Sequence, residues 1–222
     1  MFGCIFRMGC AMVLLVVGAL GWHFRDEWVP TVKALLTVEA PATSAGWAPI
    51  TAAGGTRAKE RIASLGRRGG PVYVTLTPSE FASYVLGRSP ATAGVIDTST
   101  RAVVQDGLLF IRTRLRLADI GGKDALGPVA QLFNETETVM VAGTLEVVRP
   151  GLGQYRLKEV AVRDLKLPHA VVGSLVGSLG KRWGPTPRPD SLAADGLAVT
   201  LPSDVVDLRI ADGQITLYKR TP

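Results

Sequence analysis

Few residues of this sequence belong to the types that carry out catalysis. Its two histidines, His23 and His169, are far apart in the chain, so a Ser-His-acid triad or a histidine-rich zinc site would have to be built around His169 alone. Ser174 and Ser178 lie in a glycine-rich stretch that lacks the G-x-S-x-G pattern of a nucleophile elbow. We therefore predict that the chain is not an enzyme.

The sequence also gives little support for a phosphate-binding or cation-binding site. The glycine pairs lack the preceding strand, the spacing and the lysine of a phosphate-binding loop; they are Gly54-Gly55, Gly69-Gly70 and Gly121-Gly122. Asp119, Asp124, Glu135 and Glu137 offer oxygen ligands for a cation, but acidic loop residues are usually only solvated. We predict no nucleotide, metal ion or other cofactor.

The cysteines and the charge narrow the class of protein further. Cys4 and Cys10 both lie in an apolar N-terminal segment, and the rest of the chain has no cysteine. The fold must therefore depend on its core rather than on disulfides or thiolate metal sites. The net charge of +6 suits a protein that works near anionic lipid. Because no basic stripe is interleaved with aromatic residues, we predict no nucleic-acid binding and assign most of the charge to solvated strand faces.

An uncharged apolar stretch runs from Met8 to Phe24. It suffices for a transmembrane helix if Arg7 reaches the interface, and Trp22 and Trp28 stand where an aromatic belt belongs. Arg7 should stay inside, which predicts a single-pass protein of a bacterial-type cytoplasmic membrane with its C-terminal domain in the periplasm. The alternative is a cleaved signal peptide with a small-residue site at Val17-Gly18-Ala19, and both alternatives export the rest of the chain.

The sequence divides into three parts. Residues 1–25 form the predicted anchor or signal peptide, residues 26–70 a juxtamembrane helix and linker, and residues 71–220 one folded domain. Within the linker, Thr56 to Leu65 are expected to form a short helix that ends at Gly66 and lies along the domain surface.

Local signals predict the first elements of the folded domain. Alternating apolar residues from Val72 to Leu76 predict a strand, after which Thr77 and Glu80 predict a capping box at the start of a helix that stops at Gly87. Two later Asp-Gly pairs predict type I′ hairpin turns, Asp106-Gly107 and Asp212-Gly213.

Long alternating strands are expected between the two hairpin turns. They begin near Leu109, Val139 and Tyr155, and a bulge near Lys158 and Glu159 accounts for the shift in apolar phase. Leu167-Pro168 then starts a second helix that runs to Trp183. Because the strands alternate rather than being apolar throughout, we predict an α+β fold with a long antiparallel sheet.

The order of these elements from Val72 to Tyr218 resembles bacterial lipid-binding proteins of the LmeA and YpmS kind, which are related to the tubular lipid-binding (TULIP) superfamily. The resemblance rests on VYVTLTPSEFASYVL, the hairpin AVVQDGLLFIRTRLRL, the strand VMVAGTLEVV, the run of YRLKEVAVRDLKLP into the helix AVVGSLVGSL, and the closing DLRIADGQITLYK. Such proteins wrap a long curved sheet around a helix and hold acyl chains in the seam. The resemblance therefore implies binding of phospholipid or another apolar ligand.

In this sequence the implied groove lies between the second helix and the sheet. The small residues Gly143, Gly173 and Gly177 would leave room for a lipid tail if they faced each other across it. The residues expected to line the groove are Leu109, Ile111, Leu115, Val139, Val141, Gly143, Leu145, Val172, Gly173, Leu175, Val176, Gly177 and Leu179. The alternative is a dry core in which these glycines only let the helix and sheet backbones approach.

Two functions therefore remain. The first is a membrane-anchored domain that binds lipid, with Arg112, Arg114 and Arg116 on one strand face as headgroup contacts; the alternative for these arginines is a solvated outer face. The second is a non-enzymatic envelope scaffold that binds a protein partner, of unknown identity, and carries no ligand.

Overall fold

The structure is a computed structural model that describes residues 46–87, 99–120, 133–163, 165–168, 171–177 and 189–220. All described residues belong to one compact unit of the chain, Glu39–Pro222. Every described member of its hydrophobic core lies between Ile50 and Leu217, so this unit carries that core by itself.

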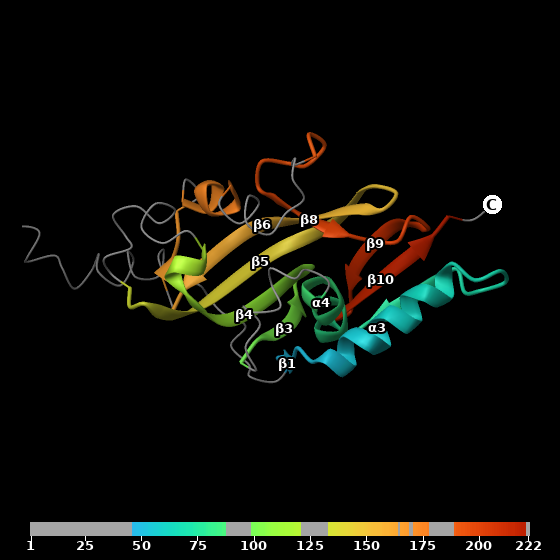
Figure 1. Ribbon diagram of the computed structural model, residues 1–222, viewed down its shortest axis with the longest axis horizontal. Coiled ribbons are helices and arrows are strands. Elements are labelled where there is room, and N and C mark those ends of the chain that lie inside the picture. Colours follow the sequence, from blue (N-terminus) through green and yellow to red (C-terminus); the bar gives the residue numbers. More distant parts are fainter. Residues whose placement is uncertain are drawn as a thin grey trace, which may run out of the picture. The chain divides into compact units, whose positions relative to one another are not determined.

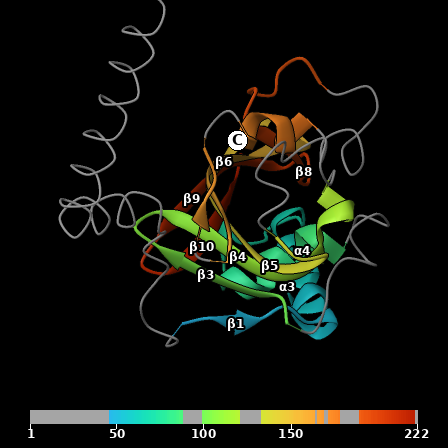
Figure 2. The ribbon, with the colours of Figure 1, turned by 90° about the vertical axis from the view of Figure 1, so that its left-hand side faces the viewer.

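The larger of two antiparallel sheets contains seven of the described strands, in the order β1-β3-β4-β5-β6, with β7 and β8 both paired to β6. Their bounds are Ala48–Pro49 (β1), Arg101–Gln105 (β3), Leu108–Arg116 (β4), Thr136–Arg149 (β5), Leu152–Val162 (β6), Leu165–Lys166 (β7) and Gly196–Thr200 (β8). Figure 1 shows β4, β5 and β6 side by side as the long strands of the fold, and Figure 2 shows how strongly they twist. The predicted α+β class with a mostly antiparallel sheet is confirmed.

The smaller sheet brings together the beginning and the end of the domain. Its order is β2-β10-β9, with β2 at Tyr73–Leu76, β9 at Val205–Ala211 and β10 at Gln214–Lys219. The inward side chains of β10, Ile215 and Leu217, are fully buried in the same core as the larger sheet. The two sheets therefore share one hydrophobic core.

The predicted turns and the predicted bulge are confirmed. Asp106 and Gly107 have φ of 51° and 73°, and Asp212 and Gly213 have φ of 51° and 72°, which is the left-handed backbone that a type I′ turn requires. The pairing of β5 with β6 shifts register opposite Lys158, where one residue of β6 has no partner.

Helix α4, Pro78–Gly87, begins with the predicted capping box. The backbone N–H of Glu80 donates to the Thr77 hydroxyl at 3.2 Å, and the Glu80 carboxylate accepts from the Thr77 N–H at 3.1 Å. Arg57 and Arg61 of the preceding helix also lie beside this carboxylate, at 3.2 and 3.6 Å. The reciprocal bonds satisfy backbone donors that would otherwise have no partner at the helix start.

Helix α3, Ala52–Leu65, belongs to the folded domain, although the domain was predicted to begin at residue 71. The sequence places residues 46–70 in a linker, but Ala58, Ile62 and Leu65 of α3 are buried in the core, and β1 pairs with β3. The helix also begins earlier than predicted, because Thr51 caps it by accepting from the Gly54 N–H at 3.0 Å. Gly54 and Gly55 are suited to this helix because they pack against Ser83 of α4, where a Cβ would meet atoms at 3.2 Å.

The described helices pack against different strands. Helix α3 lies beside β2 and β10 of the smaller sheet and α4 lies beside β3 and β10, whereas helix 171–177 lies beside β6 (Figure 1). A 3-10 helix, η1 at Leu117–Ile120, follows β4. Among the described residues no helix is both long enough and apolar enough to cross a membrane. The predicted span, Met8 to Phe24, lies outside the described residues.

Candidate functional site

The residues predicted to line a groove do share one face of the larger sheet. Leu109 pairs with Gly143 and Leu115 with Glu137 across β4 and β5, and the alternation of side chains puts these positions on the face that forms the core. Five of the predicted residues on this face are buried, namely Gly143 and the four larger residues Leu109, Leu115, Val139 and Leu145. Their side chains are packed against the protein's own core.

Two apolar residues in the middle of this face are more exposed than the buried apolar residues beside them. Ile111 and Val141 pair directly with each other on β4 and β5, pack against the core, and are only half-buried. Both strands are interior strands of the sheet, so their exposure does not come from a sheet edge. Leu109 and Val139, which lie beside them on the same face, are 2% and 4% exposed, whereas Thr113, the next residue of β4 on this face, is also half-buried. We call Ile111 and Val141 the mid-sheet patch.

A polar pair borders the mid-sheet patch on the same face. The hydroxyls of Thr100 and Thr113 are 2.7 Å apart, and Thr100 is buried. One hydroxyl donates to the other, which lowers the cost of burying Thr100 beside apolar side chains. The described surroundings of the patch are thus apolar, with one hydrogen-bonded polar pair.

Helix 171–177 packs on the core through one stripe. Val172, Leu175 and Val176 are buried at the spacing that one helix face requires, and all three belong to the core. Gly173 is exposed and Gly177 half-buried, and a Cβ on either would meet no atom within 4 Å. These two glycines therefore do not face the sheet, and the predicted glycine-lined seam is wrong at these positions. Leu179, the last predicted groove residue, lies outside the described residues.

Gly143 was predicted to face a ligand groove, but it is buried where the backbones of β5 and β6 approach each other closely. A Cβ at this position would lie 2.2 Å from the Arg156 carbonyl oxygen and 2.9 Å from Cε2 of Tyr155. It stands where the register of β5 and β6 shifts, so the backbones approach closely there. The ring of Tyr155 occupies the space that a side chain at Gly143 would fill, and this glycine leaves no room for a ligand.

Tyr155 is the most strongly perturbed titratable group on this face. Its hydroxyl donates to the Leu109 carbonyl oxygen at 2.7 Å, and burial raises the pKa of the phenol far above its usual value. The phenol therefore stays protonated and acts as a hydrogen-bond donor in the core. It has no role as a base or nucleophile.

Glu137 is a buried carboxylate at the far end of the same sheet face. It accepts from the Arg163 Nε at 2.7 Å and from the Asn134 backbone and side-chain N–H groups at 2.7 and 2.9 Å. The bond from Arg163 is the largest cause of a lowered pKa of this carboxyl group, and the Asn134 donors lower it further against the effect of burial. The sequence suggested a solvated acid or a cation ligand, but Glu137 forms a structural ion pair.

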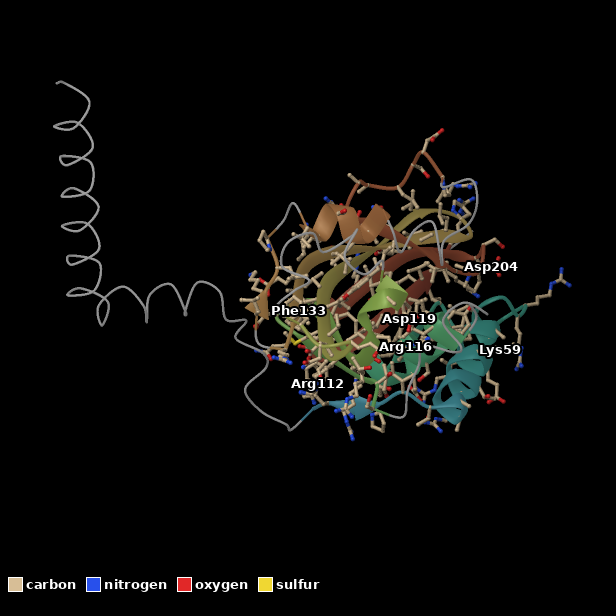
Figure 3. The ribbon with its side chains drawn as sticks, turned by 60° about the vertical axis from the view of Figure 1, so that its left-hand side comes forward. Lys59, Arg112, Arg116, Asp119, Phe133 and Asp204 are labelled. Atoms are coloured by element: carbon tan, nitrogen blue, oxygen red, sulfur yellow. The ribbon has the colours of Figure 1, made fainter. Side chains whose placement is uncertain are left out.

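The other face of the sheet carries the predicted row of arginines. Arg112, Arg114 and Arg116 alternate with the core-facing residues of β4, and Arg116 forms an ion pair with Asp119 at 3.1 Å. Figure 3 shows Asp119 beside Arg116 and away from Arg112. Two further members were not predicted: Arg101 pairs directly with Arg112 across β3 and β4, and Trp47 lies under the Arg112 guanidinium at 4.6 Å.

The described residues show no catalytic or metal-binding constellation. No group of three or more His, Cys, Asp or Glu side chains that could hold a metal ion occurs among them. His23 and His169 lie outside the described residues, so the structure does not bear on the weak case for a triad around His169.

Comparison of the chain with protein-family models, with curated proteins and with solved structures finds no match. The class of protein that the structure itself defines is an α+β domain with two antiparallel sheets that share one core. Its function must therefore be argued from the residues.

Proposed function

We propose that the chain is a membrane-anchored, extracytoplasmic domain that binds an acyl chain or a similar apolar ligand at the mid-sheet patch. The observation that carries the proposal is the half-buried pair Ile111 and Val141, which lies on interior strands beside the buried Leu109 and Val139. Apolar side chains at the centre of a sheet face are normally covered, so an accessible pair on the core-forming face suits an apolar guest.

The energetics are those of modest hydrophobic binding. Each methylene group of a ligand that leaves water contributes about 0.8 kcal/mol, so burial of six to eight methylenes gives roughly 5–6 kcal/mol before the entropic cost of binding is subtracted. That range corresponds to weak, exchangeable binding, which suits a carrier better than a permanent cofactor site.

Further support comes from the arrangement of the elements. Long, strongly twisted strands with helix 171–177 along β6 suit the architecture expected from the resemblance, in which a curved sheet wraps around a helix (Figure 2). The apolar stretch from Met8 to Phe24 supplies the proposed membrane anchor. An anchor of this kind would keep an acyl-binding domain close to its source of lipid.

Displacement of a fluorescent fatty acid from the purified unit Glu39–Pro222 tests the proposal. Ile111→Trp should weaken binding at least tenfold, because the larger side chain fills the accessible position. Val206→Trp is the matched control, since Val206 is a valine 37% exposed on β9, and it should leave binding unchanged. If the parent unit failed to bind the probe, or if both variants bound equally well, this function would be wrong.

An exposed aromatic cluster on the smaller sheet favours a second function, that of an envelope scaffold. Tyr73 is 57% exposed and its ring lies 5.9 Å from that of Tyr218, with Val72 exposed beside it. Exposed tyrosines are common anchors in protein interfaces. Crosslinking in cells from a photoreactive residue at the exposed position 72 would test this function, because a scaffold should give one specific crosslinked partner that Tyr73→Ser abolishes.

A further inference from the structure

Four arginines share the outward face of the larger sheet, where Arg114 and Arg116 are exposed and Arg101 and Arg112 are half-buried. We call Arg101, Arg112, Arg114 and Arg116 the basic face. Arg101 stands directly opposite Arg112 on the neighbouring strand, and the other three follow one another at every second residue of β4. On the other side of β4 the paired residues of β5 are Met140, Thr138 and Thr136, which carry no charge.

Little negative charge compensates this surface. Asp119 pairs with Arg116, but within the described part of the chain neither Arg101 nor Arg114 forms an ion pair. Like charges that stand directly opposite each other on neighbouring strands destabilise a sheet. The Arg101–Arg112 pair is therefore not explained by the stability of the fold, which points to a role in binding an anionic partner.

Trp47 adds an aromatic ring to the basic face. The guanidinium of Arg112 lies 4.6 Å from the centre of this ring, which is within the range of a cation–π contact. Tryptophan and arginine both combine an apolar body with a polar tip, and tryptophan is enriched where proteins meet the headgroup region of a bilayer.

We propose that the basic face docks the domain on a bilayer surface that contains anionic phospholipid. The inference rests on the proposed function in one respect, because docking would bring the mid-sheet patch to the membrane from which an acyl ligand is taken. A nucleic acid fits less well, since single-strand binding needs several accessible aromatic stacking platforms, whereas Phe110 on this sheet face is buried and Trp47 is the one aromatic ring that a described contact brings to the basic face. Each arginine near an anionic surface contributes about fivefold in binding.

Flotation with vesicles tests the docking. The unit Glu39–Pro222, which lacks the apolar stretch and carries the described core, should bind vesicles of phosphatidylcholine with 30% phosphatidylglycerol, used at about 0.1 M salt, and not vesicles of phosphatidylcholine alone. A triple variant, Arg101→Gln, Arg112→Gln and Arg114→Gln, should bind about a hundredfold less. The corresponding triple lysine variant keeps the charge and should retain most of the binding, which excludes loss of folding as the cause.

A second triple variant controls for net charge. Lys59→Gln, Arg67→Gln and Arg68→Gln remove the same charge from exposed positions on and just after α3, and Figure 3 shows Lys59 well apart from Arg112. This control should bind anionic vesicles within about twofold of the parent. Equal losses in both glutamine variants would overturn the proposal, because binding would then depend on overall charge and not on the basic face.

Further outcomes distinguish membrane docking from nucleic-acid binding and from binding of the acyl ligand. Loss of single-stranded DNA binding in the arginine triple variant, with vesicle binding unchanged, would overturn the proposal in favour of a nucleic-acid surface. Ile111→Trp should leave vesicle flotation intact, and the arginine triple variant should still bind the fluorescent fatty acid. The docking surface and the acyl site can thus fail independently.

Discussion

The hydroxyl of Tyr155 on β6 donates to the backbone carbonyl of Leu109 on β4, although β5 lies between the two strands. The bond is possible because Gly143, the residue of β5 that pairs with Leu109, has no side chain to block the tyrosine ring. One buried side chain therefore ties three neighbouring strands together at the place where the register of β5 and β6 shifts.

Removal of that hydroxyl should destabilise the domain. Tyr155→Phe keeps the ring but leaves the buried Leu109 carbonyl without this donor, which should lower the free energy of unfolding by about 1–2 kcal/mol. Urea denaturation followed by circular dichroism measures the change. Tyr218→Phe is the control, because its contacts with Tyr73 and Arg209 involve the ring, and it should change stability by less than about 0.5 kcal/mol. Equal effects of the two changes would contradict the role of the buried bond.

Two glycine-to-alanine changes should act in opposite directions. Gly143→Ala forces a Cβ to within 2.2 Å of a backbone oxygen and should cost about 2–3 kcal/mol of stability, with movement of the Tyr155 ring. Gly173→Ala places a methyl group in open space on helix 171–177 and should stabilise the domain by about 0.5–1 kcal/mol. Thermal unfolding of both variants is the measurement, and a stabilised Gly143→Ala variant would show that the close approach at the bulge is absent.

The ion pair of Glu137 predicts a dependence of stability on pH. Arg163 and Asn134 lower the pKa of this carboxyl group in the folded state below its ordinary value of 4.5. The stabilisation is therefore complete above the ordinary pKa and is lost as the pH falls through the lower folded value. The difference in unfolding free energy between the parent and Glu137→Gln should be large at neutral pH and shrink at about pH 3.

An exposed glutamate provides the comparison for that experiment. Glu60 on α3 has no ion pair among the described residues, and Glu60→Gln should leave stability within about 0.5 kcal/mol of the parent at both pH values. If the difference in unfolding free energy between the parent and Glu137→Gln stayed constant across this pH range, Glu137 would stabilise the fold by its packing and not by its charge.

The elements that could be predicted from the sequence are those whose signals are local. The capping box at Thr77 and Glu80 needs only residues three positions apart, and each Asp-Gly turn needs only its own backbone conformation. The bulge opposite Lys158 was predictable because the apolar phase changes within a single strand. These signals were enough to predict the fold class.

What the sequence did not reveal depends on contacts between distant residues. Helix α3 resembles a surface linker because its two glycines weaken the helical pattern, and only packing on Ser83 explains them. Glu137 resembles a solvated acid because its partner, Arg163, is distant in the sequence and lies in the turn that follows β6. The outward direction of Gly173 follows from which helix face meets the core, and the positions of Gly173 and Gly177 alone do not specify that face.

The Arg101–Arg112 pair predicts that part of the basic face lowers the stability of the fold. Arg101→Gln removes one of two like charges that stand directly opposite each other and should raise the free energy of unfolding by about 0.3–0.5 kcal/mol at low salt. Arg101→Lys keeps the charge and should give no such gain, and about 0.5 M salt should abolish the difference between the two variants. Arg112→Gln should gain less than Arg101→Gln, because it also loses the contact with the Trp47 ring. If denaturation showed that Arg101→Gln destabilised the domain, the arginine would serve the fold, and the reason for assigning it to an anionic partner would be lost.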